Sequence, residues 1–396
     1  MKNKCLVFIA IITVIFSCSG IKKETFNAES GLNYCESQIQ RTLDEIGDTT
    51  LLPNNIMDSL SHWKLSSIDA WTSGFWPGIL WYGYEYTNDE SLKKHAMHYT
   101  ELLEPLSLRP ARDHDLGFQI MCSYGNAYRL TGHNAYKDVI IRTADTLATL
   151  INPTVGTICS WPGFGKRNGW PHNTIIDNMM NLELLFWAAR NGGNPGLYDL
   201  AKRHADVTMH NHFRPDGLCY HVAVYDTTSG NFIKGVAHQG FSDDSFWTRG
   251  QAWAIYGYAI TYRETQDKTY LRFAEKITDA YLERLPEDGI PYWDFDAPDI
   301  PNEPRDASAA AISASALLEL SQLEDDPVKA GKYKSEAVKI LQTLSSENYQ
   351  SRETKPSFLL HCTGHKPNNS EVDASLAYAD YYYIEALSRL RKMQNK

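Results

Sequence analysis

The sequence predicts an all-α protein, and within that class an (α/α)6 barrel built from six helical hairpins. Three observations lead to this fold class. A pair of helical segments recurs along the chain, and in each pair the first segment is apolar nearly all round whereas the second is apolar on one face. Strand patterns are sparse. A closed ring buries every apolar first helix, whereas the alternative, an open solenoid, would expose one at its end.

The first helices of the pairs are rich in Ala, Gly and aromatic residues, which predicts that they form the buried inner ring. The earliest is expected around residues 76–86, with its partner at 91–103. The others that share this all-round apolar character are expected at residues 117–130, 177–189, 248–263, 308–320 and 372–390.

The second helices begin near a tyrosine and continue with apolar residues at offsets of three and four. Phe273, Ala274 and Ile277 follow Tyr270 at this spacing. Such a pattern is typical of an amphipathic helix that covers a core with one face. The second helices of this kind start near Tyr136, Tyr198, Tyr270 and Tyr333.

Strand signal is confined to residues 217–227, which alternate enough to form one arm of a hairpin, with a return at 231–234. Three loops rich in Gly, Pro and aromatic residues stand out at 161–173, 236–247 and 291–306. Long loops at one rim of a rigid scaffold are where binding and catalytic residues concentrate. We therefore expect the site at that rim.

Residues 1–17 have the features of an export signal: Lys2 and Lys4, then an apolar run that ends at Phe16. The run is shorter than the ~20 residues of a membrane-spanning helix. Cys18 stands where a bacterial lipobox places the lipidated cysteine, although Ile15 replaces the usual leucine. We expect an exported lipoprotein, in the periplasm or anchored to the outer membrane, whose residues 24–396 form one catalytic domain without a linker.

The net charge of −10 and a pI near 5.7, with no basic cluster, exclude nucleic acid as the expected partner. An anionic substrate would need a local cationic pocket. The cysteines after Cys18 are scattered and odd in number, so they predict neither a disulfide framework nor a zinc site. His204, His210 and His212 lack acidic or thiol neighbours, and no bound metal is expected.

Three acidic residues, Asp115, Asp177 and Asp306, each stand where a loop becomes an inner helix. One interpretation is helix capping, because an N-cap aspartate accepts hydrogen bonds from unpaired backbone N–H groups. Three polar residues, His114, Asn178 and Asn181, favour a functional role for the first two, because they lie on segments that are otherwise apolar. Two carboxylates in one cavity can divide the work of proton donor and ionised partner, which suits acid–base chemistry on a sugar.

The stretch HQGFSDDSFWTRGQAW places Gln239, Arg249 and Trp253 at the entry to an inner helix. Arg249 could hold a carboxylate through its planar fork. Trp253, one turn later, could stack on the face of a sugar, and packing in the core is the alternative for it. Further candidates for the wall of the site are Trp71 and Trp76.

These segments together resemble the unsaturated glucuronyl hydrolases, glycoside hydrolase family 88. The resemblance covers SGFWPG, HDLGF, the helix of Asp177, the Cys-Tyr-His strand before Val222, HQGFSDDSFWTRGQAW and the Pro-Arg-Asp entry at 304–306, in the same order and spacing. It implies the six-hairpin barrel, no metal and no cofactor. It also implies a substrate, a short oligosaccharide that ends in a 4,5-unsaturated uronic acid.

The resemblance further implies roles for individual residues. Asp177 matches the general acid and base of the family and Asp115 its second aspartate. The family adds water across the C4=C5 enol ether, so that a hemiketal forms at C5, opens and releases the neighbouring sugar. The sugar-contacting positions of the family are matched by His221, Gln239, Arg249 and Trp253, with His114 beside the second aspartate.

One departure concerns substrate choice. Relatives that prefer sulfated fragments carry serines and a lysine before the last helix, whereas here residues 361–366 retain Lys366 without the serines. Lys366 could meet a sulfate or carboxylate, or be an ordinary exposed lysine. The preference among chondroitin, hyaluronan and heparin fragments, and the oligomeric state, are therefore left open.

Three other functions compete with this one. An unsaturated rhamnogalacturonyl hydrolase would use the same barrel and chemistry on pectin fragments. A non-catalytic glycan-binding lipoprotein would keep the barrel, but the presence of both aspartates speaks against it. A conventional inverting glycosidase would act on saturated glycosides.

Overall fold

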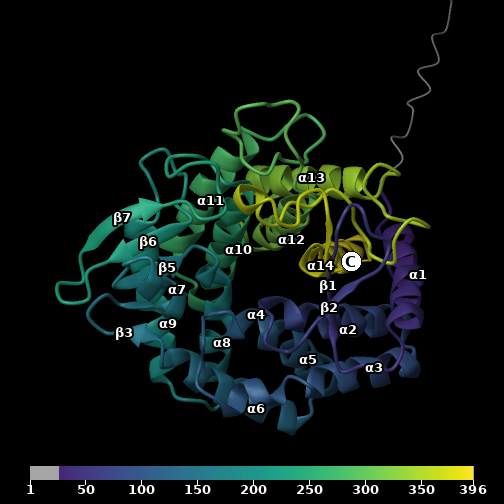
Figure 1. The fold of residues 1–396 in the computed structure, drawn as a ribbon, viewed down its shortest axis with the longest axis horizontal. Helices are drawn as coiled ribbons and strands as arrows, with labels where there is room; N and C mark the ends of the chain where they lie inside the picture. The colour runs from purple at the N-terminus through teal and green to yellow at the C-terminus, as the bar shows by residue number, and fades with distance from the viewer. Residues whose placement is uncertain (1–25, 396) are drawn as a thin grey trace, which may run out of the picture.

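The computed structural model describes residues 26–395, so the expected signal segment and Cys18 lie outside the described residues. The described chain is mostly helical, and its helices form two concentric rings (Figure 1). The predicted all-α (α/α)6 barrel is confirmed. The boundary of the catalytic domain at residue 24 stays a prediction.

The inner ring consists of helices that are buried on every side, as their composition predicts. In α12, for example, every side chain from Ala307 to Ser321 is buried. Small residues let these helices approach closely, because a Cβ at Gly257 would lie 2.4 Å from the Cβ of Met179 on the neighbouring helix. The inner helices are α2 (Phe75–Thr87), α4 (Leu116–Ile120) continued by α5 (Asn126–Thr131), α8 (Asn178–Arg190), α10 (Thr248–Thr265), α12 (Ala307–Leu323) and α14 (Ala377–Gln394).

The outer ring consists of amphipathic helices that cover the inner ring with one face. Asp89, Asp267 and Asp326 start three of them, and each side chain accepts a hydrogen bond from the backbone N–H two residues later. Such caps satisfy donors that the first turn leaves unpaired. The outer helices are α3 (Glu90–Glu101), α6 (Asn134–Ala148), α9 (Gly196–Asn211), α11 (Lys268–Leu282), α13 (Pro327–Leu344) and α1 (Ala28–Ile46).

The helices differ from the prediction in three respects. The expected helix 117–130 is divided by a π-helical segment at Met121–Gly125, which joins α4 to α5. The last helix begins at Ala377 rather than 372, because residues 375–376 form strand β8 (Ser375–Leu376) instead. Helix α1 had no counterpart in the prediction, and it packs against α14 and α2, which completes the sixth hairpin (Figure 1).

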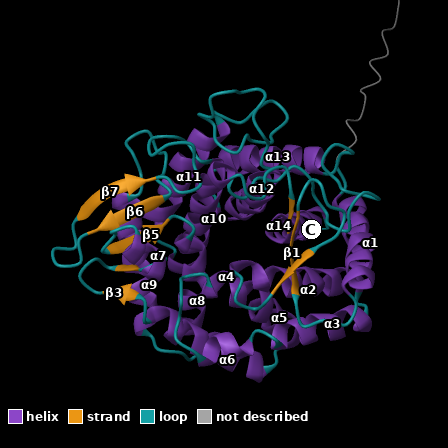
Figure 2. Cartoon of the chain, in the orientation of Figure 1, coloured by secondary structure: helices purple, strands orange, loops and turns teal. Residues whose placement is uncertain are grey.

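Short strands supplement the barrel (Figure 2). The predicted hairpin is present as β6 (Val222–Tyr225) and β7 (Phe232–Val236), and β5 (His172–Ile175) pairs with β6 to make a three-stranded antiparallel sheet. The sequence did not predict the strands outside this hairpin. These are β1 (Leu52–Ile56), β2 (Lys64–Ser66), β3 (Ile151–Asn152), β4 (Thr157–Ile158), β5 and β8.

The connections between hairpins return the chain to the same end of the barrel, so that each inner helix begins there. The loop 161–173 contains a short helix, α7 (Pro162–Arg167), and leads through β5 to the start of α8. The barrel therefore has one end at which inner helices start and another at which they finish. These ends differ in chemistry.

Candidate functional site

A cavity of about 170 Å³ lies at the end of the barrel where the inner helices begin. Asp115 precedes α4, Asp177 precedes α8, and Arg249 lies in the first turn of α10. Segments far apart in the sequence thus converge on one space. The cavity is lined by Trp71, His114, Asp115, Trp161, Ile175, Asp177, His238, Gln239, Arg249, Gly364, Glu371 and Tyr378.

The three candidate aspartates separate clearly in this structure. Asp306 is a helix cap, because its Oδ1 accepts a hydrogen bond from the backbone N–H of Ser308 at 3.0 Å. Asp115 and Asp177 occupy the same position on their helices, yet neither side chain caps the helix. Both face the cavity instead. The capping interpretation therefore holds for Asp306 alone, and the other two carboxyl groups are available for chemistry.

Burial sets the proton affinity of both carboxyl groups. It raises the pKa of Asp177 to about 7, although the positive charge of Arg249 acts against this rise. The Oδ2 atom of Asp177 has no hydrogen-bond partner among the described residues. Burial, followed by the charges of Asp113 and Asp177, raises the pKa of Asp115 well above its usual value. The pair can therefore hold a proton near neutral pH.

A histidine accompanies each carboxyl group. The Nε2 atom of His114 lies 3.4 Å from Oδ1 of Asp115, and the Nε2 atom of His221 lies 3.8 Å from Oδ2 of Asp177. Burial lowers the pKa of His114 to about 3 and that of His221 well below its usual value. Both rings are therefore neutral at physiological pH, and neither supplies a positive charge to its aspartate.

Arg249 is buried beside the cavity and fully engaged by the protein. One terminal nitrogen donates to Asp306 at 2.9 Å and to the carbonyl of Thr363; the other donates to Gly364 and to Gln239. The guanidinium also lies over the ring of Trp247, 4.8 Å from its centroid. In this state Arg249 contributes its charge to the cavity, and its forked N–H groups would have to exchange partners to hold a carboxylate.

The remaining sugar-contact candidates divide into two groups. Trp71 and Gln239 line the cavity, whereas Trp76 and Trp253 lie in the core and do not. Trp253 is completely buried and packs against Phe118, whose ring in turn contacts Trp71. Its burial matches the core-packing alternative. A contact of Trp253 with a sugar stays a prediction that requires movement of this layer.

Two further candidates lie at the margin. His221 is not part of the cavity lining, and its ring packs against that of Trp247 in a tilted arrangement, with centroids 4.2 Å apart. Lys366 begins a short 3-10 helix (Lys366–Asn368) and does not line the cavity. Gly364 and Glu371, on either side of it in sequence, do line the cavity. A contact of Lys366 with an anionic substituent stays a prediction.

Sequence reasoning missed five side chains that line the cavity: Trp161, Ile175, His238, Glu371 and Tyr378. Trp161 and His238 belong to the long loops already singled out, so position in a rim loop was the available signal. Glu371 lies before α14, where its Oε1 accepts a hydrogen bond from Nδ2 of Asn55 at 2.6 Å. That partner is more than 300 residues away, and no local pattern reveals such a pairing.

The cavity suits an anionic ligand despite its acidic residues. Among the residues that line it, Arg249 is the only lysine or arginine. The inner helices add to this charge, because helix N-termini carry partial positive charge and here they surround the cavity. The cationic pocket expected from the sequence is thus supplied by one guanidinium and by backbone dipoles.

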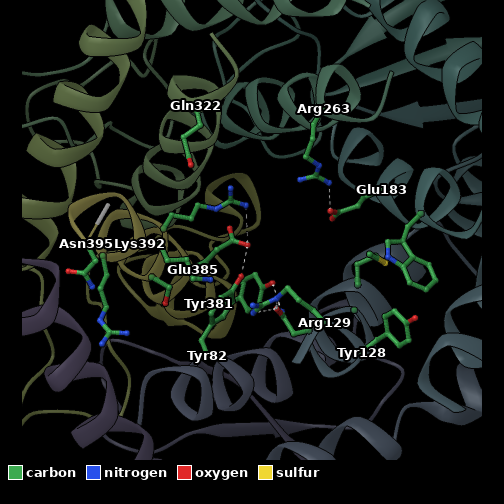
Figure 3. A pocket seen from close by; sticks show the side chains of 17 residues that line it. Tyr82, Tyr128, Arg129, Glu183, Arg263, Gln322, Tyr381, Glu385, Lys392 and Asn395 are labelled. Carbon is green, nitrogen blue, oxygen red and sulfur yellow. Dashed lines mark hydrogen bonds and ion pairs between the residues drawn. The ribbon is translucent and has the colours of Figure 1, made fainter. Parts of the chain in front are cut away.

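A larger cavity, of about 840 Å³, lies at the opposite end of the barrel (Figure 3). Figure 3 shows Arg263 directed toward Glu183 and Tyr82 toward Glu385. All five cationic side chains that line this cavity form ion pairs with carboxylates. They are Arg129, Arg263, Arg389, Arg391 and Lys392.

Within residues 26–395, no group of three or more His, Cys, Asp or Glu side chains is arranged to hold a metal ion. None of the helices in this part of the chain is long and apolar enough to cross a membrane.

Comparison with known sequences places the chain among characterised enzymes. Residues 25–392 match the model of Glycosyl Hydrolase Family 88. An unsaturated glucuronyl hydrolase of Formosa agariphila is 42% identical over 387 residues, which cover 95% of this chain and 94% of the relative. An unsaturated chondroitin disaccharide hydrolase of Streptococcus pneumoniae is 34% identical over 330 residues, which cover 82% and 83% of the two chains.

Solved structures agree with these sequence matches. An unsaturated glucuronyl hydrolase specific for heparin superposes with a TM-score of 0.88 at 40% identity, covering 93% of this chain and 98% of the other. The unsaturated glucuronyl hydrolase of Bacillus sp. GL1, responsible for the degradation of glycosaminoglycan, gives a TM-score of 0.86 at 32% identity, with coverage of 92% and 97%.

Proposed function

This chain belongs to glycoside hydrolase family 88, and on that premise we propose that it is an unsaturated glucuronyl hydrolase in which Asp177 is the proton donor and Asp115 its ionised partner. The substrate is a glycosaminoglycan oligosaccharide with a 4,5-unsaturated uronic acid at its non-reducing end. One observation supports the roles above all others. Asp115 and Asp177 occupy helix N-cap positions without capping, and both face one cavity.

The reaction that fits these residues is hydration of the C4=C5 enol ether. Protonated Asp177 donates its proton to C4, and the resulting positive charge is shared between C5 and the ring oxygen. Water then attacks C5 and returns a proton to the Asp177 carboxylate. The hemiketal at C5 opens to a ketone, and the hemiacetal left at C1 releases the neighbouring sugar. One water molecule is consumed, and the acid is restored.

Asp115 acts on the cation that forms during this step. A carboxylate beside a developing oxocarbenium ion stabilises it electrostatically, and no covalent intermediate is needed. A pKa near 7 suits Asp177, since a group with that pKa can donate and accept a proton at physiological pH. Repulsion between two nearby carboxyl groups favours a state in which only one of them is ionised.

The test follows the double bond directly. Unsaturated disaccharides prepared with lyases from chondroitin, hyaluronan and heparin are incubated with the enzyme, and the ultraviolet absorbance of the C4=C5 bond is recorded. Loss of absorbance, together with one deuteron at C4 when the reaction is run in ²H₂O, establishes hydration. Retention of the absorbance with every substrate, pectin-derived ones included, would leave the glycan-binding alternative.

The same panel addresses substrate preference. Relatives of this chain include an enzyme specific for heparin and others that act on unsaturated chondroitin disaccharides, as their names state. We propose that the stretch 361–373 contributes to this choice, because Gly364 and Glu371 line the cavity beside Lys366. The ratio of kcat/KM between sulfated and unsulfated disaccharides measures it, and an unchanged ratio in Lys366→Ala removes Lys366 from that role.

We also propose that the protein is exported and lipidated at Cys18. Support comes from the sequence alone: the basic start, the apolar run and a cysteine at the lipobox position. Mass spectrometry of the mature N-terminus tests this, with Cys18→Ser as the control. A mature chain that begins elsewhere and partitions with the aqueous fraction would contradict the proposal.

A further inference from the structure

Asn181 is a buried amide beneath the candidate site. It lies on α8, one turn after Asp177, and its side chain is completely inaccessible to solvent. Its oxygen accepts a hydrogen bond from the backbone N–H of Phe118 at 2.8 Å, and its nitrogen lies 3.0 Å from Nδ1 of His114. Asn181 thus connects the helix that carries Asp177 to the segment that carries Asp115.

The contact with Phe118 fixes the orientation of this amide. Because the oxygen faces a backbone donor, the NH₂ group must face His114, and reversing the amide would set two donors against each other. The helices approach closely here: a Cβ at Gly117 would lie 2.4 Å from both the Cα and the side-chain oxygen of Asn181. The glycine in the Asp-Leu-Gly-Phe sequence is therefore required for this hydrogen bond.

An NH₂ group can only donate, so Nδ1 of His114 must be an acceptor. The ring is neutral, and a neutral imidazole that accepts at one nitrogen carries its proton on the other. The proton of His114 is therefore on Nε2, the atom that lies 3.4 Å from Oδ1 of Asp115. Nε2 has no hydrogen-bond partner at normal range within residues 26–395, and the side-chain oxygen of Asn178, a second neighbour of His114, is also buried without a partner there.

His221 repeats this arrangement at the other carboxyl group. Its Nδ1 accepts a hydrogen bond from the backbone N–H of Gln239 at 3.1 Å, which leaves the proton on Nε2, 3.8 Å from Asp177. Each catalytic carboxyl group is thus faced by the N–H of a neutral, buried histidine. A backbone amide sets the tautomer of His221, whereas a side chain sets that of His114.

We propose that Asn181 is a positioning residue that holds His114 in its Nε2–H tautomer, so that an N–H rather than a lone pair faces Asp115 and orients this carboxyl group beside the reacting sugar. This proposal rests on the proposed function for its catalytic consequence, but the tautomer itself is a property of the resting protein. The opposite tautomer would turn a lone pair toward the carboxylate, and Asp115 would then be driven to bind a proton.

The tautomer is measured by long-range ¹H–¹⁵N correlation spectra of protein labelled at histidine, with His114 assigned from its absence in His114→Gln. In the wild-type protein we expect a pyrrole-type Nε2 and a pyridine-type Nδ1 for His114. A pyridine-type Nε2 in the wild-type protein overturns the proposal, whatever the enzyme does to any substrate. The proposed function is tested separately by the absorbance assay.

The variant Asn181→Asp keeps the shape of the side chain and its bond to Phe118, but it presents an acceptor to His114. We expect the ring proton of His114 to move to Nδ1, or the ring to become protonated on both nitrogens, while the signals of His221 stay unchanged. We expect kcat to fall by about 100-fold with KM within threefold of wild type. This loss is smaller than the 10⁴-fold loss measured where a histidine in the wrong tautomer is itself the base.

Asn126→Asp is the matched control. Asn126 is also a buried asparagine on an inner helix, but it lies at the opposite end and bonds to Tyr381, the carbonyl of Cys122 and Arg129. Its substitution should leave the His114 spectrum and kcat unchanged. An Asn181→Asp protein with a wild-type His114 spectrum, or with a changed spectrum and wild-type kcat, would contradict the positioning role. If this variant does not fold, the wild-type spectrum still decides the tautomer.

Discussion

Two aspartates at one end of the barrel and Glu319 at the other show opposite outcomes of burial. Where the inner helices begin, Asp115 and Asp177 have no ion-pair partner except neutral histidines, and burial raises the pKa of both. Where the same helices end, burial acts on Glu319 as well, but the charges of Arg263 and Arg389 overcome it and lower its pKa. The two arginines contact Glu319 at 2.6 and 2.7 Å.

This contrast shows how one scaffold separates stability from reactivity. A buried carboxylate with matched cations is held ionised, and removing one partner leaves the others uncompensated. A buried carboxyl group without a cation destabilises the fold when ionised, yet it is the group that can exchange a proton near neutral pH. The helix dipoles differ between the two ends in the same way. The C-termini of the inner helices carry partial negative charge, and the arginines and lysine at that end oppose it.

The largest expected effect is a loss of activity at the end of the barrel where the inner helices begin. Asp177→Asn should lower kcat for loss of the C4=C5 absorbance on the order of 10³-fold, because the proton donor is removed. Its stability should be equal to or higher than that of wild type at pH 8, since a carboxyl group without a cation has been replaced by a neutral amide. Thermal unfolding at the same pH gives the second quantity. Substantial turnover by the folded variant would remove Asp177 from the role of acid.

At the other end of the barrel, where Glu319 is paired with two arginines, we expect a loss of stability without a loss of activity. Glu319→Gln should lower the free energy of unfolding by about 3 kcal/mol, because Arg263 and Arg389 lose a shared, buried partner. The kcat of the folded fraction should remain within about twofold of wild type. Urea denaturation followed by circular dichroism measures the first quantity, and assays well below the unfolding midpoint measure the second. A loss of kcat without a loss of stability would mean that the two ends are coupled.

The pH dependence sharpens the same comparison. In the proposed reaction Asp177 must be protonated to act, so kcat/KM should fall by about tenfold per pH unit above pH 7, through the raised pKa. The free energy of unfolding should also fall as the pH rises. The folded-state pKa lies above the unfolded value, so the contribution of Asp177 is complete below about pH 4 and is lost as the pH rises through about 7.

Asp177→Asn provides the control for this titration. The difference in unfolding free energy between the variant and wild type should grow from pH 5 to pH 8 in favour of the variant, by about 2.5 kcal/mol. Parallel stability curves over that range would show that Asp177 titrates normally. In that case a raised pKa could not be the basis of its reactivity.

The smallest effect is expected for a solvent-exposed ion pair at the end of the barrel where the inner helices finish. Lys392 pairs with Glu85 at 2.6 Å, but the lysine side chain is 55% exposed. Lys392→Gln should change the free energy of unfolding by less than about 1 kcal/mol and leave kcat unchanged, because exposed ion pairs are screened by water and salt. A change comparable to that of Glu319→Gln would show that the network acts as one unit rather than through its buried members.

Much of the fold could be predicted because burial leaves a local record. Helices that are apolar on every side, such as α10 and α12, can only be stable inside the ring, and the one-sided apolar face of α11 places it outside. Helix α1 was missed because its hairpin partner, α14, lies at the other end of the chain. The start of α14 was placed too early because β8 is formed by pairing with the distant β1.

The site was predictable in part for a related reason. Asp115 and Asp177 stand at loop-to-helix junctions, and that position is visible in the sequence. The sequence could not tell whether they cap, since Asp306 has the same local pattern and does cap. Nor could it show that the fork of Arg249 is already bound by Asp306 and by backbone carbonyls. These partners are separated by tens to more than a hundred residues.

The sequence by itself determined the helical repeat, the inner and outer rings, the rim that holds the candidate site and, through resemblance, the family. These properties depend on periodicity and residue type, which are written along the chain. Only the tertiary structure decided which carboxyl groups are unpaired, which histidine nitrogen faces each of them, and that Trp253 is covered by Phe118. Those properties depend on distances of a few ångströms between residues far apart in sequence, and electrostatic and hydrogen-bond energies change steeply over such distances.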